Sequence, residues 1–254
     1  MKRIVLGDPH GKWDEIEKIY NKEQPDEVII LGDYFDSFDI DAYTQRETYT
    51  KIINLRKEHL KKKKGRFVML IGNHDMHYMD EKFGRCSGWN PLTCSLANYL
   101  LCRDWNANIL SICFIDEVNK TIYSHAGVSK NWCEKFSINY LGHINDLATQ
   151  YFIFTYSAGG DYYGSSSYNG PLWIRPEGLK KSPYFEINED TKEEIVWNQV
   201  FGHTALNAPI HWKDERGGEF YGMDCLSEAY LVENLDKKKV LIDRHIEYIE
   251  NEVS

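Results

Sequence analysis

Acidic, amide and histidine side chains follow five short apolar runs of the chain, in each case directly after the run ends. These stretches are Arg3-Ile-Val-Leu-Gly-Asp8-Pro-His10, Val28-Ile-Ile-Leu-Gly-Asp33, Phe67-Val-Met-Leu-Ile-Gly-Asn73, Thr121-Ile-Tyr-Ser-His125 and Gln199-Val-Phe-Gly-His203. Short apolar runs of this kind indicate buried strands, and ligands of open α/β sheets collect at the carboxyl ends of strands. We therefore expect the closing residues to meet at one site.

The six side chains at these ends offer oxygen and imidazole donors without a thiolate. They are Asp8, His10, Asp33, Asn73, His125 and His203. Such donors suit Mn, Fe, Zn or Mg ions rather than copper(I) or an iron-sulfur cluster. Six exceed what one catalytic ion takes from a protein, whereas two ions about 3.5–4 Å apart that share a carboxylate would use them all. Two divalent ions outweigh the two Asp charges, so the pocket should attract phosphate.

Helices and further strands must position these residues. We expect helices over residues 13–20, 41–62 and 92–102, two more helices within 130–156, and a Gly/Ser/Tyr-rich loop over 157–170. A hairpin is expected from 109–115 and 121–124 around a polar turn. The strands expected at 197–201, 219–223, 229–233 and 240–242 should form an antiparallel second sheet. This order suggests two stacked sheets with helices outside, an α-β-β-α sandwich.

Composition narrows the class of protein. The chain has 254 residues, 42% apolar and 27% charged, with a net charge of −9. We treat it as one domain over residues 1–254, with a cap insertion at about 130–170. The negative charge argues against an extended nucleic-acid partner and an anionic membrane. No apolar run is long enough for a signal peptide or a membrane span, so we expect a cytoplasmic protein. The basic run at residues 61–64 indicates a solvated helix end, with a phosphate-rich partner as the alternative.

The motifs themselves resemble a known superfamily. Gly7-Asp8-x-His10-Gly11, Gly32-Asp33-x-x-Asp36, Gly72-Asn73-His74-Asp75, His125-Ala-Gly and Gly202-His203-Thr204 are similar to the successive motifs of the calcineurin-like metallophosphoesterases. Within it, Gly32-Asp-Tyr-Phe-Asp36, Ser124-His-Ala-Gly-Val-Ser129 and Pro171-Leu-Trp-Ile-Arg175 resemble the phosphoprotein phosphatase branch. That branch includes bacterial and phage Ser/Thr phosphatases and symmetrical diadenosine tetraphosphate hydrolases. The resemblance implies the metallophosphoesterase fold, a four-layer α-β-β-α sandwich of two mixed sheets flanked by helices.

The resemblance also implies roles for individual residues. One metal would be held by Asp8, His10 and Asp33, and the other by Asp33 as the bridge with Asn73, His125 and His203. A hydroxide bridging the metals would attack phosphorus. His74, oriented by Asp36, would protonate the leaving oxygen. Arg175 and Asn73 would contact the phosphoryl group, Arg175 through two oxygens.

One position departs from the branch. An arginine usually follows the second acid of the Asp33 motif, and this chain has Ser37 there, followed by Phe38. Arg46 and Arg85 are candidates to supply the missing charge. Asp75 stands where the branch commonly has Glu, which is a milder change.

Aromatic residues gather between His125 and Arg175. They are Tyr140, Tyr151, Phe152, Phe154, Tyr156, Tyr162, Tyr163 and Tyr168. Those of residues 151–156 are expected to pack a cap helix. The tyrosines of the glycine-rich loop, Tyr162, Tyr163 and Tyr168, are the better candidates to contact substrate.

The leading functional interpretation is a phosphatase with two divalent ions, acting on a phosphoprotein or a small phosphorylated compound. Mn is the first expectation for the metal, with Fe, Zn, Mg or Ni as the others. The alternative is hydrolysis of a phosphoanhydride in a nucleotide or dinucleoside polyphosphate. An inactive binding module and a nuclease are less favoured, because all six ligands and His74 are present and no extended basic stripe is seen.

Overall fold

Two β-sheets lie face to face in the computed structural model, which describes residues 1–62, 65–147, 150–237 and 239–244. The first sheet is mixed, because β1 to β4 run parallel while β12 and β13 are antiparallel to their neighbours. Its six strands, in spatial order, are β13 (Lys239–Arg244), β12 (Ala229–Asn234), β1 (Lys2–Leu6), β2 (Glu27–Ile30), β3 (Phe67–Leu70) and β4 (Leu110–Ser111).

The second sheet is also mixed. Its central strands β6, β9 and β11 run parallel, and the outer strands β5 and β10 pair with them antiparallel. In spatial order the five strands are β10 (Ile210–Lys213), β11 (Glu219–Gly222), β9 (Asn198–Phe201), β6 (Thr121–Ser124) and β5 (Cys113–Asp116). A separate hairpin is formed by β7 (Phe185–Ile187) and β8 (Glu194–Val196).

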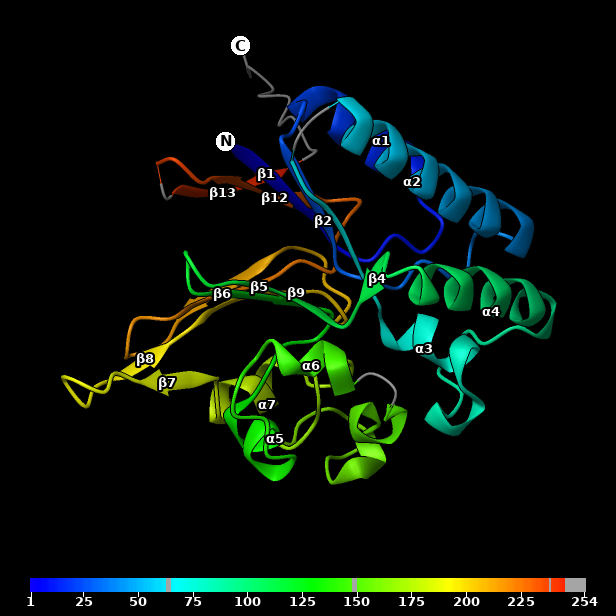
Figure 1. Ribbon diagram of the computed structural model, residues 1–254. Coiled ribbons are helices and arrows are strands. Elements are labelled where there is room, and N and C mark those ends of the chain that lie inside the picture. Colours follow the sequence, from blue (N-terminus) through cyan, green and yellow to red (C-terminus); the bar gives the residue numbers. More distant parts are fainter. Residues whose placement is uncertain (63–64, 148–149, 238, 245–254) are drawn as a thin grey trace, which may run out of the picture.

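Helices cover the outer faces of both sheets, which gives the four layers predicted from the resemblance (Figure 1). Above the first sheet and beside it lie α1 (Trp13–Glu23), α2 (Ala42–Lys62), α3 (Asn73–Met79) and α4 (Pro91–Asn106). Beneath the second sheet lie α5 (Lys130–Lys135), α6 (His143–Asp146) and α7 (Pro176–Lys181). Short 3₁₀ helices occur at Glu81–Phe83, Tyr151–Phe154 and Tyr156–Ala158. Among the described residues, no helix is both long and apolar enough to span a membrane.

Alternating side chains along the strands face different parts of the core. Val5 and Ile29 pack with Tyr123, Val200 and Tyr221 in the layer between the sheets. The neighbouring residues of the same strands, such as Ile4, instead join the helix-side core. This alternation follows from the two-residue repeat of a strand, and it fixes the register that brings the strand ends together.

An ionic cluster joins the two sheets at the amino end of β1. The guanidinium of Arg3, only 2% exposed, donates to Glu27 of the first sheet (2.7 Å) and to Asp116 of the second (2.9 Å). It also donates to the Tyr123 hydroxyl at 2.8 Å and to Glu233 at 3.2 Å. One buried cation therefore binds three carboxylates drawn from both sheets.

The predicted hairpin is present, because β5 pairs antiparallel with β6 around the polar turn, but one predicted strand and one predicted sheet were wrong. The run 109–115 is not a single strand: Leu110–Ser111 is β4 of the first sheet, and only the last residues of the run belong to β5 of the second. The carboxamide oxygen of Asn145 accepts from the backbone N–H groups of Ile112 and Cys113 at this division (2.9 and 3.1 Å). The last strands also do not form an antiparallel second sheet: β12 and β13 extend the first sheet beside β1, and β9 and β11 are parallel.

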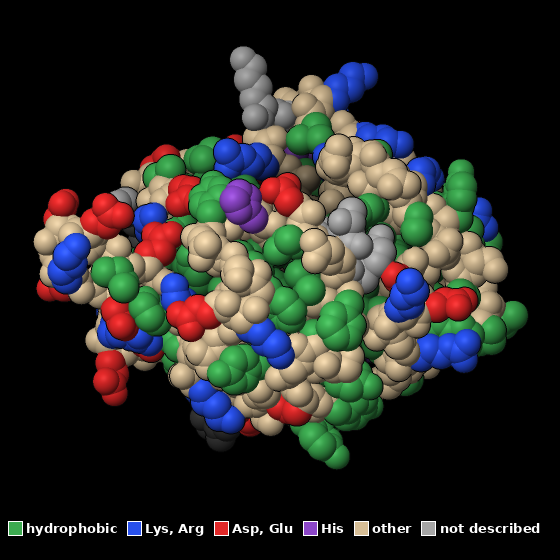
Figure 2. All heavy atoms as spheres, turned by 60° about the horizontal axis from the view of Figure 1, so that its bottom comes forward, with side chains coloured by type: hydrophobic (Ala, Val, Ile, Leu, Met, Phe, Trp, Pro, Cys, Tyr) green, Lys and Arg blue, Asp and Glu red, His purple; other side chains and the backbone are tan. Residues whose placement is uncertain are grey.

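The segment 130–156 forms short helices rather than two long ones, and α3 was not predicted as a helix. Lys63 and Lys64 of the basic run lie outside the described residues. On the face shown in Figure 2, lysine and arginine side chains stand among acidic ones without forming a continuous basic stripe.

Candidate metal centre

The carboxyl ends of parallel strands bring the site together from both sheets. Loops after β1, β2 and β3 carry Asp8 with His10, Asp33 and Asn73, and loops after β6 and β9 carry His125 and His203. Because the two sheets are stacked, these loops meet at one end of the sandwich. The six residues predicted as ligands are linked there by contacts of hydrogen-bond or ion-pair length, described next.

Asp33 lies at the centre of the group. Its Oδ2 is 3.9 Å from His10 Nε2, in the loop after β1, and 3.3 Å from His125 Nε2, in the loop after β6. Its Oδ1 accepts from the backbone N–H of His74 at 2.9 Å. Burial raises the pKa of Asp33, but the neighbouring His125, His74 and His10 outweigh burial and hold that pKa well below its usual range. A carboxylate so placed faces both halves of the site.

Asn73 connects the two histidines of the second sheet. Its Oδ1 lies 2.8 Å from His125 Nε2 and 2.9 Å from His203 Nδ1. The other amide atom, Nδ2, donates to Cys86 Sγ at 3.3 Å, which is consistent with the oxygen being the atom turned toward the imidazoles. Burial and the nearby His125 lower the pKa of His203, so its ring is neutral and carries a free lone pair.

Asp8 has a buried oxygen with no partner. Its Oδ2 accepts from the His203 backbone N–H at 2.9 Å, whereas Oδ1 makes no hydrogen bond within the described structure. Gly202 allows this close approach, since a Cβ there would stand 2.0 Å from Asp8 Oδ1. Burial and the carboxylates of Asp224 and Asp33 raise the pKa of Asp8. A cation bound here would offset the free-energy cost of burying an unpaired carboxylate oxygen among other acids.

The backbone at the site is strained. His10, Asp33, Asp36 and His203 have φ values of 42°, 58°, 66° and 66°, in the left-handed region that non-glycine residues seldom adopt. His10 N–H donates to the Asp33 carbonyl at 2.9 Å, which ties the first two loops together. Strain of this kind costs of the order of 1–3 kcal/mol per residue and is typical of functional sites.

Asp75 holds the loops of β2 and β3 in place from behind. Its carboxylate is fully buried and accepts from the backbone N–H groups of Asp33 (2.7 Å), Tyr34 (2.9 Å) and Gly72 (2.9 Å). Burial and the nearby Asp33 raise the pKa of Asp75 to about 7, although the three backbone donors lower it. The residue that differs from the branch pattern is therefore part of the frame that supports Asp33.

The donor set fits divalent ions. His10 Nδ1 donates to the Phe35 carbonyl (2.6 Å) and His125 Nδ1 to the Leu31 carbonyl (3.0 Å), so that both Nε2 atoms turn toward Asp33. A second ring nitrogen bonded to a carbonyl is the usual arrangement of a metal-binding histidine. Two ligand atoms that bind the same ion at about 2.1 Å, at right angles to each other, are about 3 Å apart. The distances from Asn73 Oδ1 to His125 Nε2 and His203 Nδ1, 2.8 and 2.9 Å, are close to this value. Asp8, Asp33 and His125 also form a buried group of possible ligands on geometric grounds.

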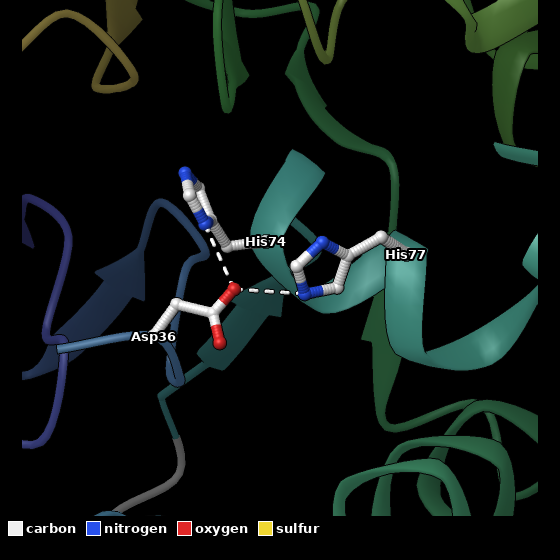
Figure 3. A group of neighbouring side chains, drawn as sticks. All are labelled: Asp36, His74 and His77. Atoms are coloured by element: carbon white, nitrogen blue, oxygen red, sulfur yellow. Dashed lines mark hydrogen bonds and ion pairs between the residues drawn. The ribbon is translucent and has the colours of Figure 1, made fainter. Parts of the chain in front are cut away.

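Figure 3 shows a second cluster, in which two imidazoles approach the same carboxylate oxygen of Asp36. His74 Nδ1 lies 2.9 Å from Asp36 Oδ2, and His77 Nε2 lies 2.8 Å from it without the alignment of a hydrogen bond. The Tyr78 hydroxyl donates to the other oxygen. Burial lowers the pKa of His74, but Asp33 and Asp36 outweigh burial and raise it to about 9.

The spacing of Asp36, His74 and His77 would allow a metal site. The position of the proton on His77 argues against one. His77 Nδ1 accepts from the Cys86 backbone N–H at 3.0 Å, so the proton of the neutral ring is on Nε2, the atom that faces Asp36. With three groups turned toward it, Asp36 has little remaining capacity for an ion. The cluster is better suited to fix the orientation of His74, which sequence reasoning assigned to Asp36 alone.

A cavity of about 790 Å³ opens in front of these groups. It is lined by His10, Asp33, Asp36, His74 and His203 together with Lys12, Ser37, Phe38, Arg175 and Asp224, among other residues. Neither Arg46 nor Arg85 lines it. Arg46 lines a different cavity, and the guanidinium of Arg85 stacks on Trp89 at 3.8 Å. Of the three arginines proposed for phosphate, the structure brings only Arg175 to the site.

The loop tyrosines lie beside the site rather than within the cavity. Tyr162 and Tyr163 are 62% and 76% exposed, and their rings are 5.6 Å apart. Tyr162 contacts Trp173, whose indole lies 5.8 Å from the His203 ring and donates to the Tyr162 carbonyl at 2.9 Å. The side chain of Tyr151 is outside the described part of the structure. An aromatic surface thus begins at His203 and reaches solvent.

Sequence reasoning missed several residues of the site. Asp224 follows β11 as His203 follows β9, and an acid directly after an apolar strand was the signal used for Asp8 and Asp33. Burial raises the pKa of Asp224, and His10 lowers it. Lys12 was overlooked because it directly precedes a predicted helix. No local pattern indicates His77, which reaches Asp36 only through the tertiary fold.

A family model described as calcineurin-like phosphoesterase matches residues 1–236. Comparison with curated proteins gives no match. A solved structure provisionally described as a diadenosine tetraphosphatase has 14% identity and a TM-score of 0.48, covering 97% of this chain and 94% of its own. An archaeal phosphodiesterase structure has 11% identity and a TM-score of 0.41, covering 96% of this chain and 99% of its own.

Proposed function

The chain belongs to the calcineurin-like phosphoesterase family, and from this premise we propose that it hydrolyses phosphomonoesters with the help of two divalent metal ions. The substrate would be a phosphoprotein or a small phosphorylated compound. Asp8, His10 and Asp33 would hold one ion, and Asp33, Asn73, His125 and His203 the other. Mn²⁺ is the first choice, because the donors are mixed oxygen and imidazole.

One observation carries this proposal. His10 and His125 each donate Nδ1–H to a backbone carbonyl, and the Nε2 atoms of both rings lie within 4 Å of the same oxygen of Asp33. Two histidines that merely packed in the core would have no reason to share one carboxylate oxygen in this way. The arrangement supports Asp33 as the ligand common to both ions.

The side chains around the ions would then divide the reaction between them. Ions bound at these ligands would polarise the phosphoryl oxygens and lower the pKa of a water molecule. His74, held by Asp36, would give a proton to the leaving oxygen. Arg175 would neutralise charge on the phosphoryl oxygens.

Hydrolysis of a nucleotide phosphoanhydride is the second candidate. The cavity of about 790 Å³ is large enough for a nucleotide. The aromatic surface of Tyr162 and Trp173 next to His203 offers a place for a base to stack. Both candidates require the same metal centre and differ in the group attached to phosphate.

The test is an activity panel on protein stripped of metal and reloaded separately with Mn²⁺, Fe²⁺, Zn²⁺, Mg²⁺ or Ni²⁺. Substrates are phosphopeptides, small phosphomonoesters, nucleoside polyphosphates and dinucleoside polyphosphates. We expect hydrolysis only after metal addition, with phosphomonoesters cleaved fastest. Faster cleavage of the polyphosphates would favour the second candidate, and full activity in verified metal-free protein would contradict the metal mechanism.

A further inference from the structure

Two basic side chains, Lys12 and Arg175, line the 790 Å³ cavity within the described part of the chain. Several acids line the same cavity, including Asp36, Asp39 and Asp224. Even so, neither the Lys12 ammonium nor the Arg175 guanidinium makes an ion pair or hydrogen bond with another described residue. The guanidinium of Arg3, by contrast, pairs with three carboxylates.

A tight turn fixes where Lys12 stands. Its backbone N–H donates to the Pro9 carbonyl at 2.9 Å, directly after Gly11, whose φ of +84° favours glycine. The Gly11 carbonyl accepts from the Thr48 hydroxyl of α2 at 2.9 Å. Lys12 then occupies the N-cap position of α1, and its side chain makes no capping hydrogen bond. The backbone of Lys12 is therefore held rigidly two residues after His10, while its half-buried side chain lines the cavity.

Lys12 and Arg175 approach the metal centre from different loops. Lys12 belongs to the loop of His10, whereas Arg175 immediately precedes α7 and contributes to the lowered pKa of His203. An anion bound in this cavity beside His10 and His203 would therefore have two positive side chains among the residues that line its site. The family pattern instead expects two arginines, and the position of one of them is taken by Ser37.

We propose that Lys12 binds an oxygen of the phosphoryl group that is hydrolysed and, with Arg175, replaces the arginine absent at Ser37. An ammonium is a compact point charge that can bind one oxygen, whereas an arginine forks onto two. The pair would therefore hold the phosphoryl group by three contacts rather than four. Lys12 would act in binding, without donating a proton or forming a bond to phosphorus.

The proposed role of Lys12 rests on the proposed hydrolysis, but the first measurement is of phosphate binding and does not require activity. Calorimetry measures the affinity of Mn²⁺-loaded protein for inorganic phosphate in wild type, Lys12→Gln and Lys12→Arg. Loss of one charge-assisted contact predicts a roughly 10- to 100-fold weaker affinity in Lys12→Gln. Lys12→Arg should retain most of it. Lys18→Gln removes the same charge from an exposed position of α1 and should bind phosphate like the wild type.

Kinetics then separates the two proposals. With small phosphomonoesters, Lys12→Gln should raise KM and the inhibition constant of phosphate by similar factors while Mn content stays unchanged. Unchanged phosphate affinity in Lys12→Gln would overturn the role of Lys12. So would a loss of activity in Lys12→Gln that is confined to polyphosphate substrates. Failure of Lys12→Arg to bind phosphate, with its metal content complete, would overturn it as well. Absence of hydrolysis by the wild type would contradict the proposed function instead, and the calorimetry would still decide the role of Lys12.

Discussion

His74 illustrates how one residue can lie against a metal ligand and still have a separate function. Its backbone N–H contacts Asp33, while its ring contacts Asp36. If the ring acts as the general acid, His74→Asn should keep both ions and lower kcat for alkyl phosphates by about 10²–10⁴-fold. Aryl phosphates, whose leaving groups need less protonation, should lose less. Kinetics over leaving groups of graded pKa checks this, and an equal loss for all of them would rule out the acid role.

Asp36 should act through His74. Asp36→Asn should therefore reduce the same rates, and the double variant should cost far less than the product of the two single effects. His77 and Tyr78 also face Asp36, so part of the orientation of His74 should survive in Asp36→Asn. Fully multiplicative losses would show that Asp36 and His74 act independently.

Asp33 differs from the other ligands because it faces both halves of the site. Asp33→Asn should lower the metal content per chain further than Asn73→Ala, since only Asp33 is proposed to contact both ions. Elemental analysis of the purified variants measures this directly. Two ions retained in Asp33→Asn would show that the shared ligand has been assigned to the wrong residue.

At the level of loops and strands, Gly72 separates the backbone of α3 from Asp33. Its φ of −103° suits any residue, but a Cβ would stand 1.9 Å from Asp33 Oδ1. Gly72→Ala should therefore displace Asp33 and reduce metal content as well as stability, by about 1–3 kcal/mol for overpacking. Gly65→Ala is the matched control, because its Cβ would stand 1.9 Å from the Asp26 carbonyl, in the connection between β2 and β3. Gly65→Ala should lose stability and keep its metal. If Gly65→Ala loses both, the loss of metal in Gly72→Ala is not specific to the site.

How far the sequence predicts these elements depends on the range of the interactions that form them. The ends of β1, β2, β3, β6 and β9 were predictable, because each apolar run stops at a polar residue within a few positions. The division of 109–115 was not, because Asn145, far along the chain, binds the N–H groups of Ile112 and Cys113 there. The sheet to which β12 belongs was also not predictable, since alternation along a strand does not identify its neighbour.

The same limit applies to the site. Its six predicted ligands stand at strand ends, and the structure brings all six together. Asp224 carries the same signal and could have been found. Lys12, His77 and Trp173 depend on which loops become neighbours, and no local spacing indicates that.

At the level of the whole molecule, Arg3 joins the sheets at the end of β1 remote from Asp8. Arg3→Met would leave Glu27, Asp116 and Glu233 buried without their cation, which should destabilise the protein by about 3–5 kcal/mol at pH 7. Burial already holds the pKa of Glu233 above its usual value with Arg3 present. Without Arg3 the pKa of Glu233 should rise further. The pKa of Asp116, which burial raises but Asn119 and Arg3 together lower more, should rise as well. Their protonated forms then favour folding, so the destabilisation should shrink as the pH falls from 7 toward 5.

Denaturant unfolding of wild type and Arg3→Met at several pH values measures this difference. Arg216→Met is the control, because Arg216 pairs with Asp214 and Glu194 at a more exposed position, and its loss should cost about 1 kcal/mol or less. A destabilisation of Arg3→Met that does not change with pH would show that lost packing, rather than unpaired carboxylates, is responsible.

The place of β1 in its sheet has a consequence for synthesis. β1 lies between β2 and β12, with Lys2 opposite Asn234 and Val5 opposite Leu231. A nascent chain on the ribosome therefore makes β1 long before β12, the partner for its second edge. Until then, an apolar strand has one open edge, which is a template for aggregation. We expect ribosome-bound chains arrested before β12 to need a chaperone to remain unaggregated, and those arrested after β12 has emerged to need it much less.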